Sequence, residues 1–138
     1  MPVERFQEDE ALIRRLLDCQ SACDWDGVRQ VLAEDAVFEM PFINETFSGR
    51  ETIIARWRPS LERMEGARFY DVTLRPLAEA GWYIAEFRNT CTVTTTGLLY
   101  DQAYIAMFQI QDGMIVLFRE FFDTLRLAIA LKRVERAA

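Results

Sequence analysis

YDQAYIAMFQIQDGMIVLFREFFD, residues 100–123, is the stretch of sequence that decides the fold. Apolar and polar residues alternate on both sides of Asp112-Gly113, which is the pattern of two half-buried strands. An Asp-Gly pair between two such runs is a strong signal for a two-residue hairpin turn. The stretch therefore predicts an antiparallel hairpin, and its second strand carries a carboxylate, Glu120, between Phe118 and Phe122.

The turn also predicts which side chains share a face of the hairpin. If Asp112 and Gly113 are the two turn residues, Gln111 faces Met114, and counting backward pairs Glu120 with Ile105. One face then holds Ala103, Ile105, Met107, Phe118, Glu120 and Phe122. The other face holds Gln102, Tyr104, Leu117, Arg119, Phe121 and Asp123. A one-residue bulge would exchange half of these positions and turn Tyr104 and Gln102 toward a ligand.

Glu120 is the charge that this register turns inward, whereas Arg119 and Asp123 point outward to solvent or to a second subunit. Burying a charge without a partner costs several kcal/mol. In an apolar pocket, desolvation should raise the pKa of Glu120 and prepare it to act as a general acid or base. The alternative is that Glu120 forms a structural ion pair, for example with Arg88, or that a bulge turns it outward.

The rest of the chain predicts three helices before the strands. Helical spacing covers residues 4–22, 24–33 and a third segment from 48, and a strand is expected at 34–42 with a loop at 43–48. Further strands are expected at 67–76, 82–93, 98–110 and 114–123, followed by a helical tail at 124–134. Asp24 and Asp123 fit as helix N-caps. This order predicts one α+β domain over residues 1–138, with helices on one face of a curved antiparallel sheet.

Charge and composition exclude several classes of partner. The net charge is −6, from 16 basic and 22 acidic residues, and no basic stripe is present. This balance argues against nucleic acid and against an anionic membrane surface as partners. No signal peptide and no apolar run of about 20 residues is found, so a cytoplasmic protein is the expectation.

The absence of histidine restricts the chemistry. The chain has 3 cysteines, no Cys-x-x-Cys pair and no histidine, which speaks against a disulfide framework and against a metal site. It also removes the commonest general base near neutral pH. Acid–base chemistry must therefore rest on Asp, Glu, Tyr, Lys or Cys, and no cofactor motif is present.

Two stretches together resemble the nuclear-transport-factor-2-like superfamily, which includes ketosteroid isomerase, the SnoaL-like polyketide cyclases and the phenazine-biosynthesis A/B proteins. The first is DWDGVRQVLAEDAVFEMPF (24–42) followed by GRETI (49–53), and the second is residues 100–123. The resemblance implies a cone, in which the curved sheet wraps three N-terminal helices and leaves an apolar pocket at the open end. It also implies that Glu120 faces that pocket, as the matching glutamate does in phenazine A/B-like proteins.

The same resemblance argues against the usual ketosteroid isomerase mechanism. That enzyme uses a base aspartate, with a tyrosine and a protonated aspartate as its oxyanion hole. The matching positions fall at Met40, near Leu16 and near Ile105 in this chain, and all three are apolar.

Several other residues are candidates for lining the pocket. Trp57 lies where the isomerase has a pocket tyrosine, but core packing explains it equally well. Glu86 and Arg88 share one face of their strand, and two interpretations are open. Either Glu86 faces the pocket as the second carboxylate of an acid–base pair, or both residues are exposed charges on the outer face of the sheet. The predicted pocket residues besides Glu120 are Phe38, Met40, Trp57, Glu86, Arg88, Tyr104, Ile105, Phe118 and Phe122.

Two hypotheses follow for the function. The first is a cofactor-free isomerase or cyclase that performs acid–base chemistry on an apolar ring or carbonyl compound, with Glu120 moving the proton. The second is a non-catalytic ligand-binding or dimerisation module. Both include a small apolar ligand and a homodimer formed through the outer face of the sheet.

Overall fold

Two long strands, β5 (Trp82–Val93) and β6 (Leu98–Gln111), are the centre of a strongly curved sheet. The computed structural model describes residues 2–134. Within them, seven strands pair in the order β2-β1-β7-β6-β5-β3, and β4 also pairs with β5. The remaining strands are β1 (Leu32–Met40), β2 (Glu45–Ser48), β3 (Met64–Glu65), β4 (Phe69–Pro76) and β7 (Met114–Phe122).

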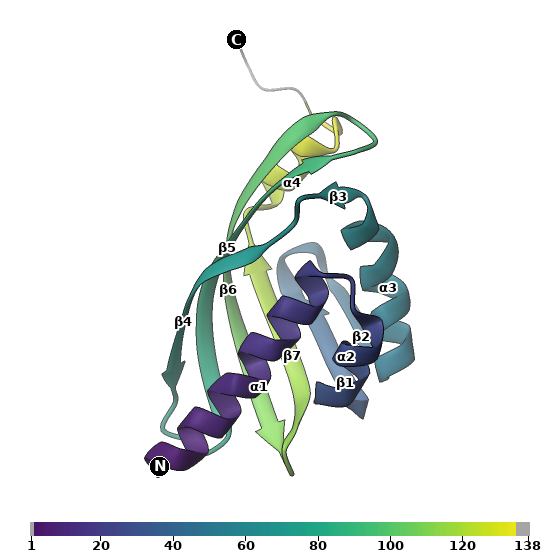
Figure 1. Ribbon diagram of the computed structural model, residues 1–138. Helices are drawn as coiled ribbons and strands as arrows, with labels where there is room; N and C mark the ends of the chain where they lie inside the picture. The colour runs from purple at the N-terminus through teal and green to yellow at the C-terminus, as the bar shows by residue number, and fades with distance from the viewer. Residues whose placement is uncertain (1, 135–138) are drawn as a thin grey trace.

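The helices lie against one side of this sheet (Figure 1). They are α1 (Val3–Ser21), α2 (Trp25–Val31), α3 (Arg50–Glu62) and α4 (Thr124–Ala130), and a short 3-10 turn covers Pro41–Ile43. The long helix α1 crosses in front of the sheet, and α4 sits under the curled ends of β5 and β6. The predicted α+β cone is confirmed. None of the helices in residues 2–134 has the length and apolarity needed to cross a membrane.

Two helices start at the residues expected. Asp24 accepts a hydrogen bond from the Gly27 backbone N–H at 2.9 Å and caps α2. Asp123 accepts from the N–H of Leu125 and of Arg126 at 3.0 and 3.3 Å and caps α4. Since a helix leaves its first N–H groups unpaired, each aspartate fixes where its helix begins.

The sheet differs from the prediction in two respects. It is mixed rather than wholly antiparallel, because β1 runs parallel to β7. The segment predicted as a loop at 43–48 contains strand β2, which pairs with β1 from Met40↔Glu45 to Val37↔Ser48. The chain reverses there through Asn44, whose φ of 56° lies in the left-handed region that asparagine tolerates. Four residues were too few for their alternation to be recognised in the sequence.

The register of the β6–β7 hairpin is shifted by one residue from the simple count. Gln111 pairs with Met114 and Ile110 with Ile115, but Gln109 pairs with Leu117, so Val116 is an extra residue in β7. Such a bulge moves every later partner by one position and increases the local twist. Glu120 therefore pairs with Ala106, and the predicted pairing of Glu120 with Ile105 is wrong.

Phe118 is at the centre of the aromatic core. Its side chain is 1% exposed. Its ring packs against Phe108, Phe38 and Trp57, with centroids 4.4, 5.1 and 5.7 Å away. These rings belong to β6, β1 and α3, so this cluster ties the hairpin to the first strand and the third helix.

We expect Phe118→Ala to destabilise the protein by about 3–4 kcal/mol, because the lost ring leaves a cavity between three elements. Urea unfolding followed by circular dichroism measures the change. Leu99→Ala is the control, since Leu99 is 65% exposed and should change the unfolding free energy by about 0.5 kcal/mol or less. Equal losses in the two variants would contradict the placement of this core.

Candidate functional site

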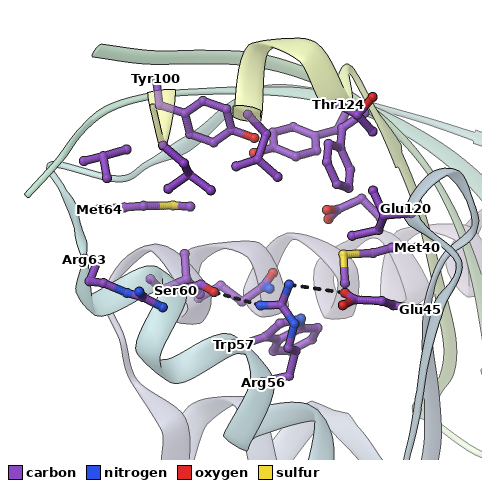
Figure 2. Close-up of a pocket in the computed structure, with 18 of the residues that line it drawn as sticks. Met40, Glu45, Arg56, Trp57, Ser60, Arg63, Met64, Tyr100, Glu120 and Thr124 are labelled. Carbon is purple, nitrogen blue, oxygen red and sulfur yellow. Dashed lines mark hydrogen bonds and ion pairs between the residues drawn. The ribbon is translucent and has the colours of Figure 1, made fainter. Parts of the chain in front are cut away.

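A cavity of about 540 Å³ lies between α1, α3, α4 and the concave face of the sheet. This volume is in the range that small-molecule sites occupy. Most of the wall is apolar, and five of the predicted pocket residues contribute to it: Phe38, Met40, Trp57, Tyr104 and Phe122. Figure 2 shows two charged side chains that reach into the cavity from different walls, Glu120 from the sheet and Arg56 from α3.

Glu120 projects its carboxyl group into this cavity (Figure 2). It lies on β7 between two buried phenylalanines, and strand alternation directs all three side chains to the concave face. No residue in the described part of the chain donates a hydrogen bond to its carboxyl oxygens. The side chain keeps some accessible surface because it opens on the cavity, but protein surrounds it on every other side.

Desolvation raises the pKa of Glu120 from its ordinary value of 4.5 to about 8, and the positive charge of Arg56 opposes this rise. A carboxyl group with this pKa is largely neutral at pH 7 and is a much stronger base than an exposed glutamate once it is ionised. The structure places Glu120 on the inner face, as predicted. The alternative, an ion pair with Arg88, is not formed, because Arg88 pairs with Asp101 on the outer face.

Arg56 is held in place on the opposite wall. Its guanidinium donates to Ser60 Oγ at 2.8 Å and lies 3.4 Å from a carboxylate oxygen of Glu45. Ser60 is one helical turn further along α3, and Glu45 comes from β2. These two contacts fix the guanidinium but do not use all five of its N–H donors. Arg56 can therefore still donate a hydrogen bond to an acceptor on a ligand.

Two tyrosines of β6 form the polar part of the sheet wall. Burial raises the pKa of Tyr100 to about 12, against hydrogen bonds from Gln102 and Tyr104 that lower it. Burial likewise raises the pKa of Tyr104 well above its usual value. Both phenols therefore remain protonated at neutral pH and are able to donate. Gln102 Nε2 donates to the Tyr100 hydroxyl oxygen at 3.0 Å, so the Tyr100 proton must point elsewhere.

The remaining predicted pocket residues lie outside the cavity wall. Phe118 is behind it, in the aromatic core. Ile105 is 52% exposed on the outer face, because the bulge at Val116 turns Tyr104 and Ala106 inward instead. Glu86 and Arg88 are also on the outer face, where Arg75 pairs with Glu86 at 3.1 Å and Asp101 with Arg88 at 3.2 Å.

The corrected register changes the comparison with ketosteroid isomerase but not its result. Ile105 is not on the pocket face, so the position to compare is Tyr104 or Ala106. Met40 lines the cavity and Leu16 is fully buried in the core. No aspartate is among the described residues that line the cavity.

Most polar residues of the cavity wall were not predicted from the sequence, among them Gln20, Arg56 and Tyr100. Arg56 precedes Trp57, and its i+4 spacing to Ser60 was a signal that the polar edge of the third helix flanks the apolar stripe. Tyr100 is two positions before Gln102 and four before Tyr104, so it shares their face. A shifted register was needed to recognise that this face is the inner one.

Comparison with known proteins agrees with this geometry. The sequence profile of the SnoaL-like domain matches residues 13–118. The chain is 34% identical to an uncharacterised PhzA/B-like protein of Pseudomonas aeruginosa over 128 residues, covering 90% of this chain and 88% of that protein.

Solved structures show the same fold. A crystal structure of a provisionally assigned isomerase from Bacillus subtilis superposes with a TM-score of 0.86 at 25% identity, covering 94% of this chain and 96% of that one. A phenazine biosynthesis-related protein of Pseudomonas aeruginosa gives a TM-score of 0.78 at 14% identity, covering 99% and 93%. Because its sequence matches the family profile over residues 13–118, and the curved sheet agrees with the solved structures, this chain belongs to the SnoaL-like domain family.

Proposed function

We propose that this protein is a cofactor-independent isomerase or cyclase that acts on an apolar ring ketone or related carbonyl compound. The observation that carries the proposal is the carboxyl group of Glu120, which faces an apolar cavity without a hydrogen-bonding partner in the described residues. Structural carboxylates in proteins are normally paired, because an unpaired buried charge is costly. A relative described as a provisional isomerase supports the same reaction class.

In this proposal Glu120 acts first as a base. Its carboxylate removes a proton from the carbon next to the substrate carbonyl, and the electron pair moves to the carbonyl oxygen. A phenol proton of Tyr100 and the guanidinium of Arg56 stabilise the negative oxygen. The neutral Glu120 then returns the proton to another carbon of the same substrate. The substrate is isomerised, and the carboxylate is regenerated with no other reagent.

The raised pKa suits this role. With a pKa of about 8, the ionised Glu120 is roughly a thousandfold stronger as a base than an ordinary glutamate. Near neutral pH, a fraction of the Glu120 side chains is still ionised and can act as the base. Trp57, Phe38 and Phe122 belong to the apolar wall of the cavity and would contact a flat apolar ring bound there.

The outer face of the sheet supports a homodimer in the same proposal. Three exposed or half-buried apolar residues, Phe42, Ile105 and Phe121, line a shallow hollow there, and we call them the outer-face patch. Charged residues also line this hollow: Asp71, Glu86, Arg88 and Asp123. Phe42 and Ile105 are 67% and 52% exposed, and the rings of Phe42 and Phe121 meet with centroids 5.2 Å apart. Side chains of this kind are depleted on free surfaces and enriched in contacts between subunits. A second copy of this chain would cover both patches symmetrically.

Glu120→Gln should slow enolisation of the substrate by about 100-fold or more, because the amide cannot accept the proton. The measurement is exchange of the protons next to the carbonyl in D₂O, followed by NMR on flat ring ketones beginning with 1-tetralone. Wild-type exchange should rise with pH and level off above about 8, as Glu120 ionises. Glu79→Gln, at an exposed position before β5 that lines neither hollow, is the matched control and should keep the wild-type rate.

Exchange that is equally fast in Glu120→Gln would contradict the catalytic role. Binding of a ring ketone without any exchange in the wild type would favour the non-catalytic ligand-binding module. The apolar residues at the isomerase positions, Met40 among them, are the observation in favour of that second function.

We expect sedimentation velocity at micromolar concentration to show a dimer, and Ile105→Glu to shift it to a monomer by placing a charge in the outer-face patch. Circular dichroism should show an unchanged fold, since Ile105 packs little against its own chain. A monomeric wild type would rule out this interface.

A further inference from the structure

Gln20 is a buried amide that the protein itself does not use. It lies in the last turn of α1, is 3% exposed and forms part of the cavity wall. Its Oε1 is buried with no hydrogen-bond partner, and no described residue bonds to its side chain at all. Desolvating an amide oxygen without replacing its hydrogen bond is unfavourable, so this group needs an explanation.

The position itself calls for an apolar residue. Gln20 continues the buried stripe of α1 formed by Ile13, Leu16 and Leu17, at spacings of three, four and seven residues. A leucine or methionine would fill this position and leave no polar atom unsatisfied. Packing of α1 against the sheet therefore gives no reason for an amide here.

Gln102 shows what a structural glutamine looks like in the same molecule. Its side chain is also fully buried, at 0% exposed. Its Oε1 accepts from the backbone N–H of Ala103 and of Asp123, both at 3.1 Å. Its Nε2 donates to the Asp123 carbonyl at 2.8 Å and to Tyr100 at 3.0 Å. Gln102 thus stabilises the junction between β7 and α4 through its hydrogen bonds, whereas the side chain of Gln20 forms no hydrogen bond to any described residue.

Gln20 enters the cavity from a different wall than the reacting groups. Glu120 and Tyr100 come from the sheet and Arg56 from α3, whereas Gln20 comes from α1. A ligand that fills the cavity with its carbonyl between Glu120 and Arg56 also lies against the α1 wall, to which Gln20 belongs. A purely apolar ligand would leave the amide oxygen without a partner, as it is in the free protein, whereas a ligand with a hydrogen-bond donor would satisfy it.

We propose that Gln20 is a ligand-binding residue that accepts a hydrogen bond from a hydroxyl or amino group of the substrate, so that the substrate is a ring carbonyl compound with a second, hydrogen-bonding substituent. This inference rests on the proposed function for the carbonyl group. The missing hydrogen-bond partner of the Gln20 amide oxygen does not depend on the proposed function, because it is observed in the protein without a ligand.

The first test compares the stability of two matched variants without any ligand. Methionine keeps the length and approximate volume of glutamine but removes its polar atoms. Gln20→Met should leave the melting temperature unchanged or raise it by about 4 °C, because an unsatisfied group is removed. Gln102→Met should lower it by about 10 °C, because four hydrogen bonds are lost and backbone groups are left unpaired. A loss in Gln20→Met as large as that in Gln102→Met would overturn the proposal, since it would reveal a structural role.

The second test measures, by calorimetry, the affinity of the protein for 1-tetralone and for its ring-hydroxylated derivatives. Wild-type protein should bind one hydroxylated isomer about tenfold more tightly than 1-tetralone itself, as one hydrogen bond to a buried amide is worth that ratio. Gln20→Met should lose this preference and keep its affinity for 1-tetralone. Equal preference in the two proteins would overturn the role of Gln20.

The two proposals fail in different ways. If hydroxylated tetralones bind through Gln20 but show no proton exchange in D₂O, the catalytic function is wrong and the binding role of Gln20 stands. If exchange occurs and depends on Glu120, but the hydroxyl group brings no gain at any ring position, the function stands and the inference about Gln20 is wrong.

Discussion

One extra residue in β7, Val116, determines which side chains of the hairpin meet inside the cone. The regular count from the Asp112-Gly113 turn would place Ile105 opposite Glu120 on the concave face. The bulge moves the partner to Ala106 and turns Tyr104 and Tyr100 inward with it. Both phenols line the cavity and bring hydrogen-bond donors to its sheet wall. The candidate site depends on this local irregularity of the sheet.

The cavity combines two features that oppose stability. It is an unfilled space of about 540 Å³ beside the aromatic core, and it contains the unpaired polar groups of Glu120 and Gln20. A chain selected for stability alone would fill the space and pair or remove these groups. The rest of the fold compensates through the Phe118 cluster and through fully bonded buried groups such as Gln102. Two unpaired polar groups gathered in one cavity are the pattern expected of a ligand site. Outside the cavity, the described residues contain one further buried polar atom without a hydrogen-bond partner, Arg50 Nε.

The sequence was sufficient for the α+β cone and for the inward orientation of Glu120, but not for the parallel pairing of β1 with β7 or for strand β2. Periodicity identified the long helices and strands, aspartates at 24 and 123 located two helix starts, and the alternation around Glu120 gave its orientation. The sequence was insufficient for Ile105, because a bulge has no residue signature in an ordinary run of apolar residues such as Ile115-Val116-Leu117. The sequence did not decide whether Glu86 and Arg88 lie on the inner or the outer face of the sheet, because a strand alternates in the same way whichever face is buried. Gln20 was missed because a glutamine without partners is recognised only from three-dimensional contacts.

The central claim is that Glu120 carries an unpaired, desolvated carboxyl group in the cavity. Its pKa is measured directly by titrating the side-chain carboxyl carbon in ¹³C NMR spectra, with Glu120→Gln identifying the resonance. We expect a midpoint near 8, well above the ordinary value of 4.5. A midpoint close to 4.5 would show that Glu120 is solvated or paired with a cation, and would contradict both its environment and its role as the base.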